Sequence, residues 1–315
     1  MIKYTIKKIV NFHKNKNNTR KSYLVKKILG KNKIRLLDIG AAGGIEGIQD
    51  LWLPHLGEIE LSLCEPHEES FKKIKKQNFK IIDKAFGVEQ KKNNIFYETR
   101  KAECSSMKEL NLDYLKKFPD PERFETIKKS QIETTTLDNE FTSNNFPHFI
   151  KIDTEGAELE ILNGGNKTLE NVMGLLIEVY FKDLHKNQVK FEEINNFLSQ
   201  KKFEFIDFLR LLKWERHNQR HHGQIQVADA LFLLPPEEII FRFKEKKISI
   251  DDLKIYTSIL TIYDRSDYLS VIQENLDKKT QSDLSLQESY DFCEKKVKKK
   301  HFVTQIYNFI LKNLI

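Results

Sequence analysis

Seven short apolar segments lie between residues 34 and 234, and helix-like patterns separate most of the early ones. The segments are IRLLDIG (34–40), IELSLCEP (59–66), FKIIDKAF (79–86), FIKID (149–153), VMGLLIEVYF (172–181), FEFIDFL (203–209) and VADALFLL (227–234). Strands that alternate with helices along a chain favour a parallel sheet that helices cover on both faces. The last two segments are joined by a polar loop without a helical pattern, which predicts an antiparallel pair. The sequence therefore predicts an α/β fold around a seven-stranded, mostly parallel sheet.

Two prolines in LLPPEE (233–238) end the seventh segment, and the pattern beyond them is helical. Because paired prolines stop a strand and suit the start of a helix, we place a domain boundary there. We expect a basic helical segment over 1–33, an α/β domain over 34–234 and a helical appendage over 235–315. The stretch 87–147 is too long for one crossover, so it predicts an insertion with its own hairpin or helices.

The net charge of +7 is concentrated at the two ends of the chain. Residues 1–37 hold twelve Lys or Arg and no acid, residues 295–315 hold six lysines and no acid, and residues 38–294 have a net charge of −11. An enzyme that acts on nucleic acid is expected to carry positive charge around its active site. The acidic body therefore disfavours a nucleic-acid substrate.

The cysteines and the apolar runs bear on the compartment. Cys64, Cys104 and Cys293 are widely spaced and odd in number, so they indicate neither a disulfide framework nor a zinc site. No run approaches the roughly 18 apolar residues that cross a bilayer. The first residues, MIKYTIKKIVNFHK, interrupt their apolar positions with lysines, unlike a secretory signal. These features predict a cytoplasmic protein.

The turn after the first segment, DIGAAGG, is rich in small residues. Glycines in a strand-to-helix turn let the backbone approach a ligand closely. Glu65 ends the second segment 25 residues after Gly40, where an acid can accept hydrogen bonds from a ribose diol. The spacing fits the D-x-G-x-x-x-G pattern of S-adenosylmethionine sites, with Ala42 in place of the middle glycine. A tight turn without a ligand is the alternative, and Glu65 favours an adenosine-containing cofactor.

The fourth segment runs into three carboxylates in FIKIDTEGAELEIL (149–162). Glu155 and Glu158 can be explained by the dipole at a helix N-terminus. Asp153 lies instead at the carboxyl end of a central strand, where α/β folds place ligands. An acid there can hold the amino group of a cofactor or orient a substrate hydroxyl.

FIKIDTEGAELEILNGG resembles the K-I-D-x-E-G-x-E signature of the FkbM family of S-adenosylmethionine-dependent methyltransferases. Further blocks are similar to one branch of that family and follow its order: LLDIGAAGG, CEPHEESF, ECSSM, TTTLDNEF, IEVYF, HKNQVKFEEINNFL, FEFIDF, WERH and GQIQVADALFLL. The resemblance covers residues 34–234. It implies a class I methyltransferase fold, Rossmann-like, whose last strand is antiparallel. It also implies methyl transfer to oxygen, mainly on sugars or on hydroxyls of natural products.

The resemblance implies a role for each matching residue. The expected cofactor-binding residues are Asp38, Gly40, Ala41, Gly43 and Gly44 in the first loop, Glu65 for the ribose, Asp83, Lys84 and Ala85 for the adenine, and Asp153. The candidates for a base or a hydroxyl-orienting group are Asp153, Glu155, Glu178 and His185.

The candidates for substrate binding are Ser105, Ser106, Arg216 and Gln224, of which the serines have a capped turn as their alternative. Gln224 and Asp229 can instead brace the rim of the site. His217 and His221 have zinc-like spacing, but their segment brings no cysteine or acid, so we expect no metal.

Two functions and two roles for the termini stay open. The resemblance favours O-methylation of a sugar or glycoconjugate, and the rivals are a nucleic-acid methyltransferase and a non-catalytic binding protein with the same fold. Ile2, Ile6 and Ile9 share one helical face, and HFVTQIYNFILKNLI (301–315) is apolar after a lysine cluster. The ends either pack on the protein or attach it peripherally to an anionic membrane surface. The second role suits a lipid-linked glycan as the acceptor.

Overall fold

The computed structural model describes residues 18–44, 51–74, 79–142, 145–216, 223–296 and 298. The chain forms two compact units. The sheet unit contains 34–48 and 60–234, and the helical unit contains 1–33, 49–59 and 235–315. The termini outside the described ranges, with the apolar faces near residues 2–10 and 301–315, are not described, and neither are His217 and His221.

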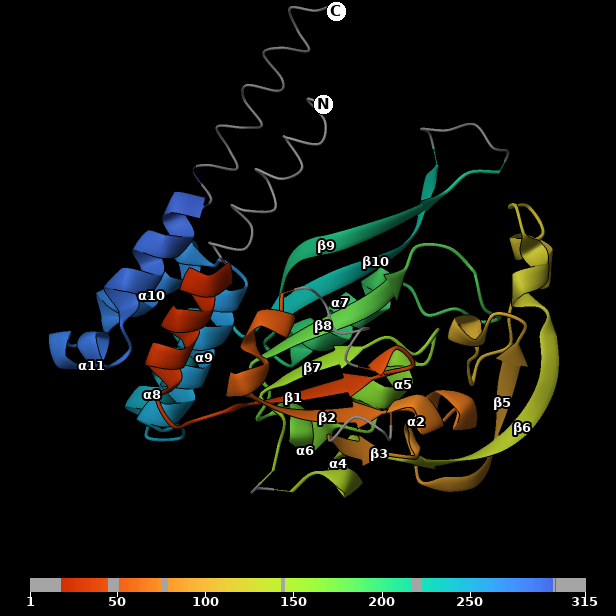
Figure 1. Cartoon of the computed structure of the whole chain (residues 1–315), viewed down its shortest axis with the longest axis horizontal. Helices are drawn as coiled ribbons and strands as arrows, with labels where there is room; N and C mark the ends of the chain where they lie inside the picture. Colours follow the sequence, from red (N-terminus) through yellow and green to blue (C-terminus); the bar gives the residue numbers. More distant parts are fainter. Residues whose placement is uncertain are drawn as a thin grey trace, which may run out of the picture. The chain divides into compact units, whose positions relative to one another are not determined.

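The sheet unit is built on a seven-stranded sheet with the order β3-β2-β1-β7-β8-β10-β9 (Figure 1). The strands are β1 (Ile34–Ile39), β2 (Ile59–Cys64), β3 (Lys80–Ile82), β7 (Phe149–Ile152), β8 (Gly174–Tyr180), β9 (Glu204–Trp214) and β10 (Gln224–Leu233). β10 runs antiparallel to both β8 and β9, while β1 pairs with β7, β7 with β8 and β2 with β3 in parallel. This is the class I methyltransferase fold, so the predicted fold class and the antiparallel pair are confirmed.

The central strands are apolar because both faces of the sheet are covered. Every residue of β8 is buried, and β1 and β7 are each buried at all positions but one. Continuous apolar runs of this kind are typical of parallel strands enclosed on both sides. Such strands end at one common edge, and the polar residues at the carboxyl ends of β1, β2 and β7 are brought together there.

The third apolar segment differs from its prediction. It was expected as one strand over 79–86, but the structure divides it into β3 and β4 (Ala85–Phe86). β4 leaves the large sheet and pairs in parallel with β6 (Thr126–Thr135). The division falls at Asp83 and Lys84, where the backbone turns from one sheet to the other.

Residues between β4 and β7 form a second, three-stranded sheet with the order β4-β6-β5. β5 (Lys91–Thr99) and β6 form an antiparallel hairpin, drawn at the right of Figure 1. The connection between them contains η3 (Ala102–Cys104), α3 (Leu112–Leu115) and η4 (Pro121–Phe124). α4 (Leu137–Glu140) follows β6.

The remaining helices of the sheet unit lie in its crossovers. They are α2 (Glu68–Ile74), α5 (Glu158–Asn163), α6 (Asn166–Leu169) and α7 (Phe191–Gln200). α7 buries Ile194 and Leu198 and packs against β8 and β9, so it covers that part of the sheet.

The helical unit contains a helix over 18–29, η2 (Leu53–Glu58), α8 (Pro236–Lys244), α9 (Ile250–Ile262), α10 (Ser266–Asn275) and α11 (Lys278–Asp283). Ser249 caps α9 with a reciprocal capping box to Asp252. Residues 49–59 belong here although the sequence placed them in the α/β domain. One reason is that the Trp52 indole donates to the Tyr263 hydroxyl at 2.9 Å. Among the described residues, no helix is long and apolar enough to span a membrane.

Candidate active site

A cavity of about 490 Å³ opens at the carboxyl ends of the parallel strands, within the sheet unit. Its volume lies in the range of small-molecule and cofactor sites. Two groups of its lining residues matter most. The acidic set is Asp38, Glu65, Asp153, Glu155 and Glu178, and the basic–aromatic set is Lys101, Arg123, Phe124, Arg210 and Trp214.

Asp38, near the end of β1, is buried and shares one lysine with Asp153. The Lys151 ammonium lies 3.0 Å from Asp38 Oδ1 and 3.5 Å from Asp153 Oδ2. Burial alone lowers the pKa of Lys151, but the two carboxylates raise it above its usual value. Burial also raises the pKa of Asp38, against the effect of Lys151. Asp38 Oδ2 is buried and has no hydrogen-bond partner among the described residues, although Asp38 lines the cavity.

Gly40 follows β1 with φ +85°, a conformation that favours glycine. A Cβ atom there would lie 1.7 Å from the carbonyl oxygen of Asp153. Gly40 and Ala41 both donate their backbone N–H to Cys64 O at 3.1 Å, which ties the loop to β2. The glycine is therefore required by the close approach of two strand ends, and the cavity lies beside that crossing.

Glu65 follows β2 and is buried in the cavity wall. Its Oε1 accepts the backbone N–H of His67 at 2.8 Å. Burial raises the pKa of Glu65 to about 7, the His67 hydrogen bond lowers it, and Asp38 adds to the rise. A buried carboxylate of this kind gains from further hydrogen-bond donors, such as the hydroxyls of a ribose.

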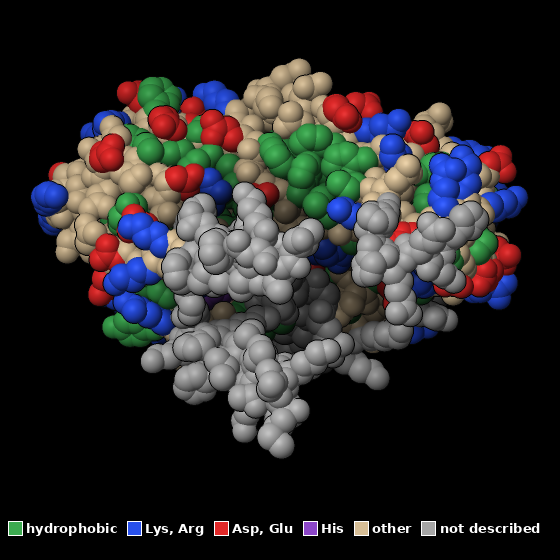
Figure 2. Space-filling model, turned by 90° about the horizontal axis from the view of Figure 1, so that it is seen from above, with side chains coloured by type: hydrophobic (Ala, Val, Ile, Leu, Met, Phe, Trp, Pro, Cys, Tyr) green, Lys and Arg blue, Asp and Glu red, His purple; other side chains and the backbone are tan. Residues whose placement is uncertain are grey.

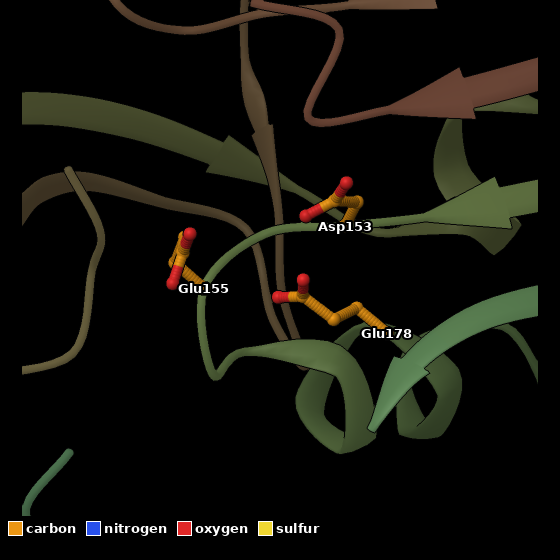
Figure 3. Close-up of side chains that lie close together, drawn as sticks. All are labelled: Asp153, Glu155 and Glu178. Atoms are coloured by element: carbon orange, nitrogen blue, oxygen red, sulfur yellow. The ribbon is translucent and has the colours of Figure 1, made fainter. Parts of the chain in front are cut away.

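Three carboxylates from two neighbouring strand ends point toward one another (Figure 3). Asp153 and Glu155 follow β7, Glu178 projects from β8, and one oxygen of each lies within 4.8 Å of the others. The Tyr180 hydroxyl donates to Glu178 Oε2 at 2.5 Å and lies 3.3 Å from Glu155 Oε2. Since a hydroxyl has one hydrogen, the contact with Glu155 is satisfied when Glu155 itself carries a proton.

The pKa values in this cluster favour retained protons. Burial raises the pKa of Glu155 to about 8, and the charges of Asp153 and Glu158 add to the rise. Burial, with Asp153 and Glu155, holds the pKa of Glu178 well above its usual range. The oxygens are close enough to share protons or to bind a cation, and Tyr180 supplies the proton donor that the structure shows.

A strained turn presents Glu155 to the cavity. Glu155 has φ +56° and Gly156 has φ +104°. Glu158 Oε1 accepts the N–H of Thr154 at 3.0 Å and that of Gly156 at 3.1 Å, so Glu158 fixes the turn. The Gly156 position favours glycine, because its φ is positive and a Cβ atom there would make a tight contact of 3.1 Å with His185 Nδ1.

His185 is buried in the cavity wall with its ring edge-on to Tyr180. Gln188 Nε2 donates to Val189 O, which orients the amide so that His185 Nδ1 donates to Gln188 Oε1 at 2.8 Å. Nε2 then carries the lone pair, and it has no partner among the described residues. Burial lowers the pKa of His185 to about 4, so the ring is neutral near pH 7.

The profile of the methyltransferase FkbM domain matches residues 38–205, which is more than half of the 315 residues. The chain belongs to the FkbM methyltransferase family. The matched range contains Asp38, Glu65, Asp153, Glu155 and Glu178, so the acidic set lies within the FkbM domain. A search among curated proteins found no match.

Solved methyltransferase structures are similar at low sequence identity. The methyltransferase FkbM from Methylobacillus flagellatus KT has 16% identity over 64% of this chain and 43% of its own, with a TM-score of 0.37. This chain therefore spans less than half the length of that protein. M. capricolum TrmK in complex with S-adenosylhomocysteine has 8% identity over 87% of this chain and 96% of its own, with a TM-score of 0.32. The Burkholderia thailandensis 1,6-didemethyltoxoflavin-N1-methyltransferase has 10% identity over 72% and 85%, with a TM-score of 0.31.

The FkbM domain places most of the expected cofactor residues around one cavity. Asp38, Gly40, Ala41, Gly43, Glu65, Ala85 and Asp153 line it. Gly44, Asp83 and Lys84 do not. Asp83 is exposed, and Lys84 forms an ion pair with Glu133 at 2.7 Å, because the chain turns there from the large sheet to the small one.

The four expected substrate residues are divided. Ser105 lines the cavity, but its Oγ accepts the backbone N–H of Thr99 at 3.0 Å. Ser106 is buried and donates to Glu155 O at 2.5 Å, so it supports the turn from behind. Arg216 and Gln224 are exposed and lie outside the cavity lining. Asp229, expected to brace the rim, lies 3.8 Å from Arg210, which does line it.

Several residues that line the cavity or contact its carboxylates were missed from the sequence. Lys151 and Tyr180 stand in the quoted stretches FIKID and IEVYF, so their positions beside Asp153 and Glu178 were a usable signal. Arg123, Phe124 and Trp214 carry no comparable signal, because their segments meet only through the folding of the hairpin connection and β9.

Proposed function

We propose that this chain is an S-adenosylmethionine-dependent O-methyltransferase that methylates a hydroxyl of a sugar or glycoconjugate. The proposal rests on two groups of residues that line the same cavity. A small-residue loop and a buried acid suited to an adenosine lie beside a cluster of three carboxylates suited to a hydroxyl.

The residues of the first feature fit the cofactor. Gly40, Ala41 and Gly43 keep the loop after β1 free of large side chains, and Glu65 offers a buried carboxylate for the ribose hydroxyls. Asp153 and the unpartnered Oδ2 of Asp38 offer negative charge for the amino group of the methionyl part. Ala85 and Phe86 line the cavity after β3, where an adenine is expected to be held.

The residues of the second feature fit proton removal from a hydroxyl. S-adenosylmethionine supplies an electrophilic methyl group on a sulfonium, and transfer to a neutral hydroxyl releases one proton. Glu155 has a pKa of about 8, close to the value at which a general base works best near neutral pH. Lys151 orients Asp153, and the Tyr180 hydroxyl connects Glu178 with Glu155 for sharing of that proton.

His185 is not the main base in this proposal. Its neutral Nε2 is buried in the cavity wall, and a pKa of about 4 makes the ring a weak proton acceptor. The geometry and the burial therefore support the Glu155–Glu178 pair as the acceptor of the proton in this proposal.

A nucleic-acid acceptor is the less favoured alternative. Among the described residues that Figure 2 colours, Lys and Arg side chains are interspersed with Asp and Glu. Tracking a phosphate backbone requires a basic stripe. The acids of the cavity itself also disfavour a polyanion next to the methyl group.

Calorimetric titration with S-adenosylmethionine and S-adenosylhomocysteine tests the proposal. We expect micromolar binding that Glu65→Ala loses and Glu60→Ala keeps, because Glu60 is an exposed residue of the same strand. Methyl transfer to sugar hydroxyls is then screened with labelled cofactor. A folded wild-type protein that binds neither compound contradicts the enzyme function and supports the binding-protein alternative.

A further inference from the structure

Two cations that line the cavity, Lys101 and Arg123, have no ion pair among the described residues. Lys101 and Arg123 belong to the connection between β5 and β6, and the backbone N–H of Lys101 donates to Arg123 O at 3.0 Å. That bond places the two residues side by side. Neither side chain forms an ion pair with a carboxylate among the residues that the structure describes, unlike neighbouring Arg100, which pairs with Glu125 at 2.6 Å.

Aromatic rings hold the Arg123 guanidinium in a defined position. Its central carbon lies 4.6 Å from the centre of the Phe124 ring and 5.3 Å from that of Trp214. The two rings are themselves 5.6 Å apart. Stacking fixes the plane of a guanidinium and leaves its N–H edge available, which is the arrangement that binds carboxylate or phosphate with two parallel hydrogen bonds.

Trp214 adds an apolar surface beside this cation. It is half-buried, lines the cavity and packs edge-on against Phe118 with ring centres 5.4 Å apart. A partly exposed, rigid aromatic face can pack against the C–H face of a sugar ring.

Glu155 of the acidic set and the two cations influence the same thiol, that of Cys104. Burial raises the pKa of Cys104 to about 12, Glu155 adds to the rise, and Lys101 and Arg123 oppose it. Cys104 therefore lies within reach of both signs of charge. An acceptor that carries its own negative group is repelled by the carboxylates and attracted by the cations, so its orientation in the cavity is set by charge.

We propose that the acceptor is a sugar that bears an oxyanion, either a carboxylate or a phosphate, which binds Arg123 and Lys101 while the ring packs on Trp214. This inference rests on the proposed function, since it names the class of acceptor for the same cavity. The oxyanion then directs a free hydroxyl of the sugar toward Asp153, Glu155 and Glu178.

The test uses the full chain saturated with S-adenosylhomocysteine and three probes: D-glucose, D-glucuronate and D-glucose 1-phosphate. Trp214 is one of two tryptophans, so in a Trp52→Phe background its fluorescence reports on the cavity alone. We expect the charged probes to bind at least about tenfold more tightly than glucose, with a loss of affinity on addition of salt. If only glucuronate binds more tightly than glucose, the site is specific for a carboxylate. If both charged probes do, the site binds oxyanions in general.

Two variants decide the assignment. Arg123→Gln is expected to remove the preference for the charged probes, whereas Arg100→Gln is expected to keep it, because Arg100 is exposed and outside the cavity lining. Equal affinity for all three probes, no binding of any probe, or a preference that survives Arg123→Gln overturns the inference. Binding of S-adenosylhomocysteine is measured in the same samples. If the wild-type protein does not bind it, the result contradicts the proposed function and not only the inferred class of acceptor.

Discussion

The acidic set and the basic–aromatic set line the same cavity but are built in different ways. Glu65 and Asp153 each follow a parallel strand directly, and Asp38 and Glu178 lie within β1 and β8 near their carboxyl ends. Arg123, Phe124 and Trp214 come from a long connection and from the far end of β9, and they are held by ring packing. The first set is positioned by backbone geometry and the second by side-chain contacts.

Because the two sets are built differently, we expect them to respond differently to substitution. Strand ends in a parallel sheet have fixed spacing and direction, so a substitution in that region acts through the backbone. Side chains held by packing can change one at a time and alter affinity without moving the sheet. We therefore expect the largest losses at the strand ends and graded losses in the basic–aromatic set.

Gly40→Ala is the most severe test of the backbone-built set. The added Cβ atom would lie 1.7 Å from Asp153 O, in a backbone conformation that side chains disfavour. We expect loss of S-adenosylhomocysteine binding and a decrease of at least about 3 kcal/mol in the free energy of unfolding. Titration calorimetry and chemical denaturation measure the two effects. Gly57→Ala is the control, since its Cβ atom has no neighbour within 4 Å; unchanged binding by Gly40→Ala contradicts the proposed geometry.

The difference between backbone-built and packing-built features also explains which parts of the structure the sequence predicts. The seven strands, their antiparallel pair and the acids at the strand ends follow from local patterns, because period and position along a strand determine them. The division of residues 79–86 into two strands was not visible, since it depends on pairing with β6 some 50 residues later. Arg123 and Trp214 were missed for the same reason: their contact joins segments that lie 91 residues apart.

Glu155→Gln tests the chemistry of the acidic set without changing its shape. An amide cannot accept the proton of the acceptor hydroxyl, so we expect kcat to decrease by about 100-fold or more. The affinity for S-adenosylhomocysteine should change little, because Glu65 and the loop after β1 are untouched. Single-turnover methyl transfer gives the rate. Glu160→Gln is the control, because Glu160 is a partly buried residue of α5 that pairs with Lys108 and lies outside the cavity lining; it should behave as wild type. A Glu155→Gln variant with full kcat removes Glu155 from the mechanism.

The pH profile sharpens the same assignment. A base is active when it is deprotonated, and the pKa of Glu155 is raised to about 8, so activity should rise with pH through that value. Below it, kcat is expected to fall about tenfold per pH unit. Rates measured from pH 6 to 9.5, with the fold checked at each pH by circular dichroism, show the profile. A rate that stays flat between pH 6 and 8 excludes Glu155 as the titrating base.

Trp214→Ala tests the packing-built set. Loss of its aromatic face should raise the KM for a sugar acceptor by up to about tenfold, in line with about 0.5–1.5 kcal/mol for an aromatic contact. The KM for S-adenosylmethionine should remain within about twofold, because no strand-end residue moves. Leu211→Ala, an exposed position on β9, is the control. Equal changes in both KM values would show that the two sets do not act separately.

The smallest effect is expected from removal of divalent metal ions. The oxygens of Asp153, Glu155 and Glu178 are close enough to bind a cation, but Tyr180 donates to the cluster and the pKa values of both glutamates are raised. Protons can therefore hold the carboxylates together without a metal. We expect EDTA to change kcat by less than about twofold, because no step of the proposed mechanism uses a metal ion. The control is re-addition of Mg²⁺ or Mn²⁺ to the dialysed protein. A large loss that one of these ions restores would make the cluster a metal site, and the acidic set would then act through a bound cation instead of a shared proton.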